Sequence, residues 1–355
     1  MDDSSTSLRA MAQDGRAAAR AMASMSGEAR DEALLAMRRS LDEAREVVSA
    51  CNAEDKAQAS RDKIDAPLLR RLDIEGAKYD AMLAKIDDVH QLADPLAAVS
   101  YACELVDGLQ LFRVACPIGV ICVIFESRPE AAVQIAALAL KSANAVILKG
   151  GREAANTNAA LVAAMQGALR AGGVVPAAAV QLVETREEIG VLLGLHDVLD
   201  LVIPRGSKAL VSHIMASTRI PVMGHADGIC SVYLDRAADP AKAARVAVDS
   251  KIDYPVACNA AETLLVHRDV IGTAWPAVAA GLLGAGVALR VDAECLAALR
   301  GAAVHRDEWE PLLRQAAPAD FDTEFLALTM AVRARRGARR LRPPPPLPLR
   351  GGSRR

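Results

Sequence analysis

Apolar and polar residues along this chain first follow a helical period and then alternate between helical and strand-like segments. Across residues 8–60, Ala, Arg, Met and Leu recur at helical spacing with Glu and Asp on the opposite face, which predicts a helical N-terminal layer. A second helical stretch is predicted over 67–90. Asp107-Gly108 then has the sequence of a hairpin turn.

Short apolar runs separated by helical stretches predict the strands. They are 119–126, 145–150, 179–183, 199–204, 220–223, 229–235, 262–267 and 287–291. Strands joined by helices of about ten residues or more form right-handed crossovers, so they should lie parallel with helices on both faces. We therefore predict an α/β fold with two parallel-sheet domains. Ligands of such sheets bind beyond the carboxyl ends of the strands.

Composition narrows the classes of function. Of 355 residues, 52% are hydrophobic, enough to bury two medium cores, but only 3% are aromatic, which disfavours a base-stacking surface and hence a nucleic-acid partner. Seven cysteines, an odd number without CxxC pairing, predict reduced thiols and no metal site. No apolar run has membrane-spanning length, and no basic segment plus apolar core opens the chain. We expect a cytoplasmic protein without a membrane partner, although an organelle address also fits.

The segment 333–355 departs from the alternating pattern. It carries nine Arg, no acidic residue and a run of four Pro, while the whole chain has a net charge of only −2. The remainder is therefore acidic. Repulsion between like charges and interruption by Pro predict a disordered tail with a short polyproline stretch.

Cys258 is the candidate nucleophile. Tyr254-Pro255 disfavours helix just before it and 263–266 predicts a buried strand just after it, so the thiol lies on a tight loop that leads into a rigid element. Ala257 and Ala260 leave room for a substrate, and a fixed thiol near backbone N–H groups suits covalent catalysis. The alternative is a buried structural cysteine, the commoner kind.

Two loops that follow predicted strands could hold a cofactor, although no G-x-G-x-x-G motif is present. Lys149, followed by Gly150-Gly151, can set an ammonium against a ribose or phosphate, but this sequence is also typical of a solvated turn. Gly206 and Ser207 open a predicted helix. Its N–H groups can meet a pyrophosphate, or Ser207 simply caps the helix.

Six long motifs resemble one family. They are 116–121 (CPIGVI), 125–130 (FESRPE), 141–154 (KSANAVILKGGREA), 200–207 (DLVIPRGS), 221–230 (PVMGHADGIC) and 253–267 (DYPVACNAAETLLVH). In this order they resemble the γ-glutamyl phosphate reductases, or glutamate-5-semialdehyde dehydrogenases, of the aldehyde dehydrogenase superfamily. The resemblance runs from about residue 8 to Val332 and is closest to the reductase half of eukaryotic pyrroline-5-carboxylate synthases, without the kinase half.

The resemblance implies an aldehyde dehydrogenase-like fold and a domain division. Residues 1–225 would form the N-terminal helices and the NADP-binding domain, 226–332 an incomplete catalytic domain, and 333–355 a disordered tail. Family members continue past Glu324 with a strand and helix that return to the cofactor domain and with an extension used in dimerisation, which the tail replaces here. The family tends to oligomerise, but its dimerisation portion is missing by this comparison.

The resemblance also implies the reaction. The Cys258 thiolate would attack γ-glutamyl phosphate and expel phosphate to leave a thioester, and hydride from NADPH would lead to glutamate 5-semialdehyde. By position, Lys149 matches the lysine at the adenosine ribose, Gly206 and Ser207 the pair at the pyrophosphate, and Glu324 the glutamate at the nicotinamide ribose. The glycines after Lys149 carry no acid to repel a 2′-phosphate, which suits NADPH.

Two positions depart from the hydrolytic aldehyde dehydrogenases. Gly224-His225 stands where those enzymes carry a general-base Glu, so attack of water on a thioester should be poor. The loop 126–129 stands where they carry an Asn oxyanion donor, which leaves the Cys258 N–H and a nearby donor for that role. Arg128 in this loop is our candidate for steering the substrate's phosphate or carboxylate.

Three hypotheses on function remain at this point. The first is an NADPH-dependent γ-glutamyl phosphate reductase of proline biosynthesis. The second is an inactive truncated product that acts only as a partner of a full-length subunit. The third is an aldehyde dehydrogenase with unrelated substrates, which would not need phosphate.

Overall fold

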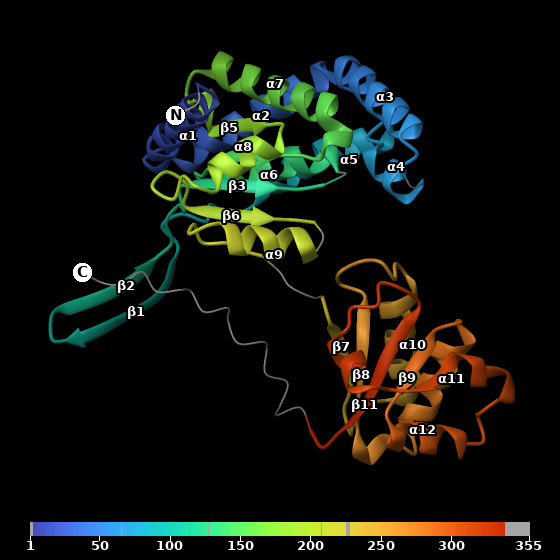
Figure 1. The fold of residues 1–355 in the computed structure, drawn as a ribbon. Helices are drawn as coiled ribbons and strands as arrows, with labels where there is room; N and C mark the ends of the chain where they lie inside the picture. The colour runs from blue at the N-terminus through green and yellow to red at the C-terminus, as the bar shows by residue number, and fades with distance from the viewer. Residues whose placement is uncertain (1–2, 65, 127, 207, 225–227, 338–355) are drawn as a thin grey trace. The chain divides into compact units, whose positions relative to one another are not determined.

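The computed structural model describes residues 3–64, 66–126, 128–206, 208–224 and 228–337. The chain divides into two compact units, Met1–Gly224 (unit 1) and His225–Arg355 (unit 2). Each unit has a hydrophobic core of its own. Both contain helices packed on a parallel sheet, so the predicted α/β class with two parallel sheets is confirmed (Figure 1).

The N-terminal part of unit 1 is helical, as predicted. Its helices are α1 (Asp3–Ala23), α2 (Gly27–Glu43), α3 (Arg45–Arg61), α4 (Ala66–Leu72) and α5 (Ala77–Gln91). The prediction of one continuous helical stretch over 67–90 was wrong, because residues 73–76 separate α4 from α5. Gly76, just before α5, has a φ of 54°, a left-handed conformation that a helix does not contain.

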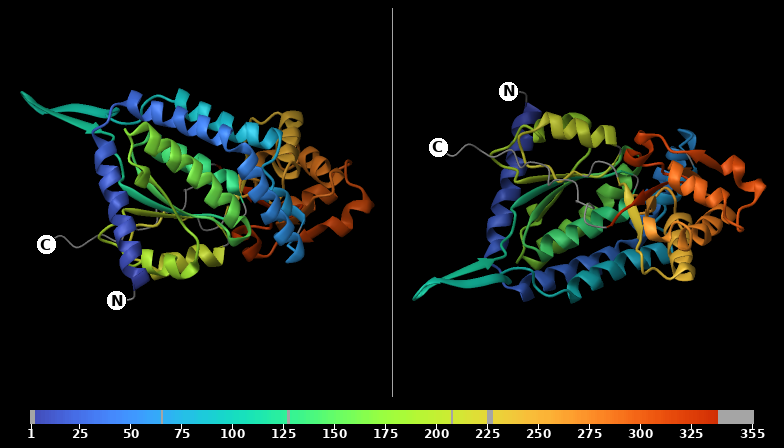
Figure 2. Two further views of the ribbon diagram at one scale, coloured as in Figure 1. Left: turned by 90° about the horizontal axis from the view of Figure 1, so that it is seen from above. Right: turned by 90° about the horizontal axis from the view of Figure 1, so that it is seen from below.

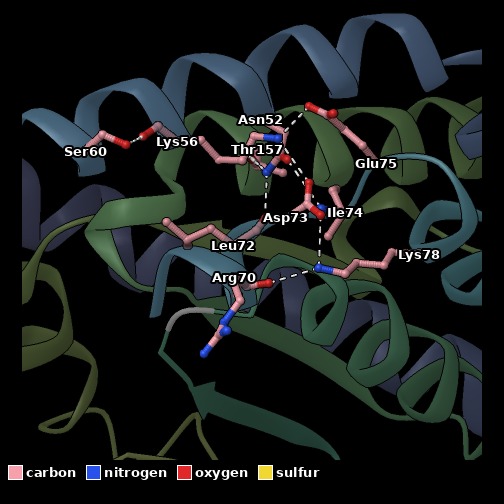
Figure 3. A network of polar contacts seen from close by, with 10 residues as sticks. All are labelled: Asn52, Lys56, Ser60, Arg70, Leu72, Asp73, Ile74, Glu75, Lys78 and Thr157. Carbon is pink, nitrogen blue, oxygen red and sulfur yellow. Dashed lines mark hydrogen bonds and ion pairs between the residues drawn. The ribbon is translucent and has the colours of Figure 1, made fainter. Parts of the chain in front are cut away.

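Asn52 of α3 holds this interruption in place. Its fully buried side chain donates a hydrogen bond to the Leu72 carbonyl oxygen (2.8 Å) and accepts one from the Ile74 N–H (3.3 Å) (Figure 3). Lys56, also on α3, forms an ion pair with Asp73 at 3.0 Å. The Asn52 hydrogen bonds satisfy backbone groups of the α4–α5 connection, and together with the ion pair they hold this connection against α3.

The described part of unit 1 contains a four-stranded parallel sheet. Its strands are β3 (Val120–Ile124), β4 (Ala145–Lys149), β5 (Val180–Val183) and β6 (Leu201–Pro204), in the order β5-β4-β3-β6. The helices that follow these strands in turn are α6 (Pro129–Lys141), α7 (Ala155–Gly172), α8 (Arg186–Leu192) and α9 (Lys208–Ser217). From β3 the chain adds β4 and then β5 on one side, and it then adds β6 on the other side of β3. The carboxyl ends of β3 and β6 are thus the topological switch point, where such sheets bind ligands.

The strand predicted over 220–223 is reduced to one bridge. Val222 pairs with Val202 of β6 in parallel. The Val202 N–H donates to the Pro221 carbonyl oxygen (2.9 Å), and the Met223 N–H donates to the Val202 carbonyl oxygen (2.8 Å). Pro221 has no N–H to contribute to a ladder, which limits the pairing.

A hairpin extends from unit 1 (Figures 1 and 2). It consists of the antiparallel strands β1 (Val99–Val106) and β2 (Leu109–Val114). The turn prediction at Asp107-Gly108 is confirmed, since Gly108 has a φ of 81° and its N–H donates to Glu104 Oε1 (2.7 Å). Nearly every position of both strands is exposed.

Unit 2 contains a second parallel sheet, five-stranded within the described residues. Its strands are β7 (Cys230–Leu234), β8 (Ala261–His267), β9 (Ala288–Val291), β10 (Leu313–Gln315) and β11 (Thr329–Arg335), in the order β10-β9-β11-β8-β7. The helices α10 (Pro240–Ile252), α11 (Ala274–Gly284) and α12 (Ala293–Arg300) accompany it. The core centres on Trp275, which is fully buried and donates from Nε1 to the Cys295 carbonyl oxygen (2.9 Å).

Strand β11 corrects the predicted start of the disordered tail. It lies between β8 and β9 and continues to Arg335, which pairs with His267. The prediction of disorder from residue 333 was therefore wrong for 333–335: the neighbouring strand β8 takes up their backbone hydrogen bonds, and the Arg333 guanidinium lies over the Phe321 ring at 5.1 Å. Residues 336 and 337 follow the strand without regular structure, and the remainder of the predicted tail, 338–355, lies outside the described residues.

Candidate functional site

The predicted cofactor residues of unit 1 lie at one edge of its sheet. Lys149 ends β4, Arg128 follows β3, and Gly206 follows β6. Since β4, β3 and β6 are parallel neighbours, their carboxyl ends lie side by side. The ladder continues into the loops, because the Phe125 N–H donates to the Lys149 carbonyl oxygen (2.9 Å) and the Arg205 N–H to that of Ile124 (2.7 Å). These loops therefore start from fixed positions.

Lys149 is half-buried, and its Nζ donates to the Gly150 carbonyl oxygen (2.8 Å). Its charge also acts on Glu188 at the start of α8. Burial raises the pKa of the Glu188 carboxyl, but hydrogen bonds from the Thr185 and Glu184 N–H groups outweigh burial, and with the Lys149 ammonium they hold that pKa below its usual value. The sequence did not reveal this acid beside Lys149, because it lies on the neighbouring strand–helix connection.

Gly150 packs where a side chain would not fit. A Cβ on Gly150 would overlap the Asn158 side-chain amide, whereas one on Gly151 would meet only the end of the flexible Glu153 side chain. Asn158, on α7, is 1% exposed, and its Oδ1 has no hydrogen-bond partner within the described segments. Close packing against Asn158 therefore favours glycine at position 150, and the sequence analysis missed this contact.

Gly206 lies at the switch point, close to two side chains. A Cβ there would lie 3.0 Å from Glu126 Oε2 and 3.0 Å from Leu210 Cδ2, so a larger residue would force its neighbours to move. Helix α9 begins shortly after it. The N–H groups of a helix N-terminus suit a phosphate group. Ser207, the other predicted residue of this pair, lies outside the described residues.

Arg128 stands at the N-cap position of α6, directly after the end of β3, and is exposed. Its neighbour Pro129 occupies the first helical turn, where a missing N–H costs nothing. One buried oxygen of Glu130, Oε2, has no hydrogen-bond partner among the residues described. An exposed guanidinium at this edge can meet an anionic group, as expected for a substrate phosphate or carboxylate.

Cys258 lies in a turn that leads into β8. The Ala257 N–H donates to the Tyr254 carbonyl oxygen (2.9 Å), and the Ala260 N–H donates to that of Ala257 (3.0 Å). Ala260 is buried at the entry to the strand, whereas Cys258 is exposed. The thiol is therefore accessible on a fixed turn, and it is not a buried structural cysteine.

Glu324 and Cys258 approach each other around Gly228. A Cβ on Gly228 would lie 2.5 Å from the Cys258 carbonyl oxygen and 2.7 Å from Glu324 Oε1. The Cys230 thiol donates to the same Cys258 carbonyl oxygen at 3.5 Å. Burial raises the pKa of the Cys230 thiol, and electrostatic interactions with Cys258, Glu262 and Glu324 raise it further. Unit 2 thus gathers two predicted site residues with two residues that the sequence analysis did not assign.

The position of this cluster differs from that of the unit 1 residues. Gly228, Cys258 and Glu324 come just before β7, β8 and β11, which are neighbours in the order β11-β8-β7. The cluster therefore lies at the amino ends of the strands. The predicted site residues of unit 1 thus follow the carboxyl ends of their strands, where parallel sheets commonly bind ligands, whereas those of unit 2 precede the amino ends.

Within the described segments, no three His, Cys, Asp or Glu side chains are grouped so that they could hold a metal ion. No helix there combines the length and apolar character needed to cross a bilayer. All seven cysteines fall in the described part and are free thiols.

Comparison with known proteins connects these features to one family. The model of the "Aldehyde dehydrogenase family" matches residues 2–294. A probable gamma-glutamyl phosphate reductase of Schizosaccharomyces pombe is 43% identical over 332 residues, which cover 92% of this chain and 72% of the relative. The gamma-glutamyl phosphate reductase of a Nostoc species is 42% identical over 328 residues, which cover 92% of this chain and 73% of the relative.

Solved structures agree with the sequence comparison. The crystal structure of gamma-glutamyl phosphate reductase from Thermotoga maritima matches with a TM-score of 0.82 and 31% identity, over 93% of this chain and 77% of that chain. The Saccharomyces cerevisiae gamma-glutamyl phosphate reductase matches with a TM-score of 0.59 and 35% identity, over 94% of this chain and 81% of that chain. An acetylating aldehyde dehydrogenase from Geobacillus thermoglucosidasius, 18% identical with a TM-score of 0.55, shares the fold.

Proposed function

Because this chain belongs to the aldehyde dehydrogenase family, and within it to the γ-glutamyl phosphate reductases, we propose that it reduces γ-glutamyl 5-phosphate to glutamate 5-semialdehyde in proline biosynthesis. The observation that carries the proposal is the exposed Cys258 thiol on a fixed turn, with the Glu324 carboxylate near its carbonyl group. We place the activity in the cytoplasm, a reducing compartment that suits seven free thiols.

Cys258 would act as the nucleophile. Its thiolate forms a bond to the γ-carbonyl carbon, the bond from that carbon to the phosphate oxygen breaks, and inorganic phosphate leaves with the electron pair. A thioester on Cys258 results. The small residues of the turn leave space for the acyl group, and the Cys258 N–H with a nearby donor is our candidate for stabilising the developing oxyanion.

The cofactor we propose is NADPH, which supplies a hydride to the thioester carbon. Lys149 and Gly206 of unit 1 fit such a group, since one offers an ammonium and the other lies just before the N-terminus of a helix. In unit 2, Glu324 offers a carboxylate that can accept hydrogen bonds from ribose hydroxyls. The Glu188 carboxylate, which lies near Lys149, would repel a 2′-phosphate. The preference for NADPH over NADH therefore depends on whether attraction by the Lys149 ammonium exceeds this repulsion.

Arg128 is our candidate for binding the substrate anion. It is exposed at the same sheet edge as Lys149 and Gly206 and can form a bidentate contact with a phosphate or carboxylate. Alanine at Arg128 should raise the KM for the substrate and leave NADP⁺ binding unchanged. An unchanged KM would exclude this role.

The test of the function is the reverse reaction of the full chain with glutamate semialdehyde, NADP⁺ and inorganic phosphate. We expect phosphate-dependent NADPH formation that disappears in Cys258→Ser. Cys116→Ser is the matched control, because Cys116 is also an exposed thiol but lies in unit 1 outside the proposed machinery. A folded protein without turnover would contradict the proposal, and oxidation that needs no phosphate would indicate an aldehyde dehydrogenase with other substrates.

A further inference from the structure

A fully buried ion pair lies beneath the Cys258 turn. Lys251, in the last turn of α10, and Glu262, in β8, are each 0% exposed, and Lys251 Nζ lies 2.9 Å from Glu262 Oε2. Removing both charges from water is costly, and well-packed apolar residues would commonly give equal stability. The pair therefore needs an explanation other than stability.

The second oxygen of Glu262 provides one. Glu262 Oε1 accepts a hydrogen bond from the Leu326 N–H at 3.2 Å. Leu326 is 43% exposed and has a φ of 51°, a left-handed conformation that a branched side chain adopts only where surrounding contacts hold it. Glu262 is thus the buried anchor of an otherwise exposed turn, and that turn directly follows Glu324.

The same ion pair also spans the Cys258 turn. Helix α10 leads into this turn and β8 continues from it, so the contact between Lys251 and Glu262 joins the two ends of the segment that carries the thiol. The two anchored segments lie close together, because the carbonyl oxygen of Cys258 and Oε1 of Glu324 would lie 2.5 Å and 2.7 Å from the same Cβ on Gly228. A shift of either segment would change the distance between them.

We propose that Lys251 and Glu262 are positioning residues of the site: their ion pair holds the Cys258 turn closed, and Glu262, through the Leu326 N–H, fixes the segment that carries Glu324. This inference rests on the proposed function, because it takes Cys258 as the nucleophile and Glu324 as the residue at the nicotinamide ribose. Neither positioning residue touches the reacting atoms.

Two double variants test the role of the Leu326 contact without leaving a lone buried charge. Lys251→Met with Glu262→Gln removes the ion pair but keeps a side-chain oxygen for the Leu326 N–H. Lys251→Met with Glu262→Met removes both. We expect the Gln version to bind NADP⁺ within about threefold of the wild type, and the Met version to bind it about tenfold more weakly, equivalent to about 1.4 kcal/mol.

Amide hydrogen exchange gives a readout that does not depend on activity. The Leu326 amide should exchange slowly in the wild type and in the Gln version, and fast in the Met version, although its side chain is exposed in all three. The Ala260 amide of the Cys258 turn, which bonds to the Ala257 carbonyl oxygen, should exchange faster than in the wild type in both double variants, because both lose the ion pair; wild-type exchange of this amide in both would overturn the role of the pair. A merely structural role would change the stability of both double variants equally. It would not separate them in NADP⁺ affinity or in the exchange of the Leu326 amide.

Equal NADP⁺ affinity and equal Leu326 exchange in the two double variants would overturn the inference. If the Met version does not fold, Glu262→Asp takes its place, since it keeps the charge next to Lys251 but is too short to reach both partners; unchanged affinity would then overturn the inference. Rapid exchange of the Leu326 amide in the wild type would do so as well. A wild type without phosphate-dependent turnover would contradict the proposed function alone, because these readouts are binding and exchange.

Discussion

Replacing Gly228 with alanine should move apart Cys258 and Glu324, the proposed site residues of unit 2, by the addition of a single methyl group. The new Cβ would lie 2.5 Å from the Cys258 carbonyl oxygen and 2.7 Å from Glu324 Oε1, whereas unbonded heavy atoms prefer about 3.5 Å. Each group must therefore move by about 1 Å. A displacement of this size in a reacting geometry can cost about 100-fold in rate, while overpacking lowers the free energy of unfolding by about 1–3 kcal/mol.

The measurement is kcat/KM in the phosphate-dependent assay, together with urea unfolding of the same preparations. Gly272→Ala is the matched control in unit 2, because a Cβ there meets nothing within 4 Å. We expect the control to keep wild-type activity and Gly228→Ala to lose about 100-fold while it remains folded. Wild-type kcat/KM in folded Gly228→Ala would refute the idea that Cys258 and Glu324 work together around this glycine.

Three further predictions follow from charges and burial. Iodoacetamide near neutral pH should alkylate Cys258 much faster than Cys230, because Cys258 is exposed, whereas burial and then nearby negative charges raise the pKa of Cys230. Peptide mass spectrometry of a time course measures the two rates, and equal rates would contradict the prediction. Burial raises the pKa of the Asp73 carboxyl, but two lysine ammonium groups outweigh burial and hold this pKa below 3.8 in the folded protein. Asp73→Asn should therefore lower the melting temperature above pH 3.8, and this effect should disappear as the pH falls below that value. Lys149→Ala should weaken NADP⁺ binding by about tenfold and weaken NAD⁺ binding by a smaller factor, as measured by titration of protein fluorescence. An equal loss of affinity for both cofactors would exclude a contact between Lys149 and the 2′-phosphate.

Burial explains which strands the sequence predicted. Strands β3, β4 and β8 are short apolar runs buried along nearly their whole length, so local composition is enough to find them. Strand β11 carries Arg at its end and β10 has only three residues, so neither shows such a run. Both became strands because neighbours distant in sequence offer them hydrogen bonds, which composition does not encode.

Local sequence indicated only candidates for the site. The residue types around Cys258 and Lys149 also fit a buried cysteine and a solvated turn, so their roles came from the resemblance to the family and stay predictions. Gly228 and Lys251 were missed because each matters through a residue elsewhere in the chain. Glu262 did carry a signal: a carboxylate inside a buried apolar strand needs a partner, and looking for that partner would have led to the positioning pair.

The sheet order of unit 2 explains why residues spread from 228 to 324 can form one site. Parallel neighbours begin at the same edge, so the segments that enter β7, β8 and β11 meet although long stretches separate them in the chain. A site assembled from three entry segments has no single rigid element beneath it, and each segment must be tied to the others by side chains. The buried carboxylate of Glu262, which bonds to Lys251 on one side and to the Leu326 N–H on the other, is placed to make that connection. A neutral apolar residue at position 262 could fill the same volume but could not hold the two segments at a fixed distance.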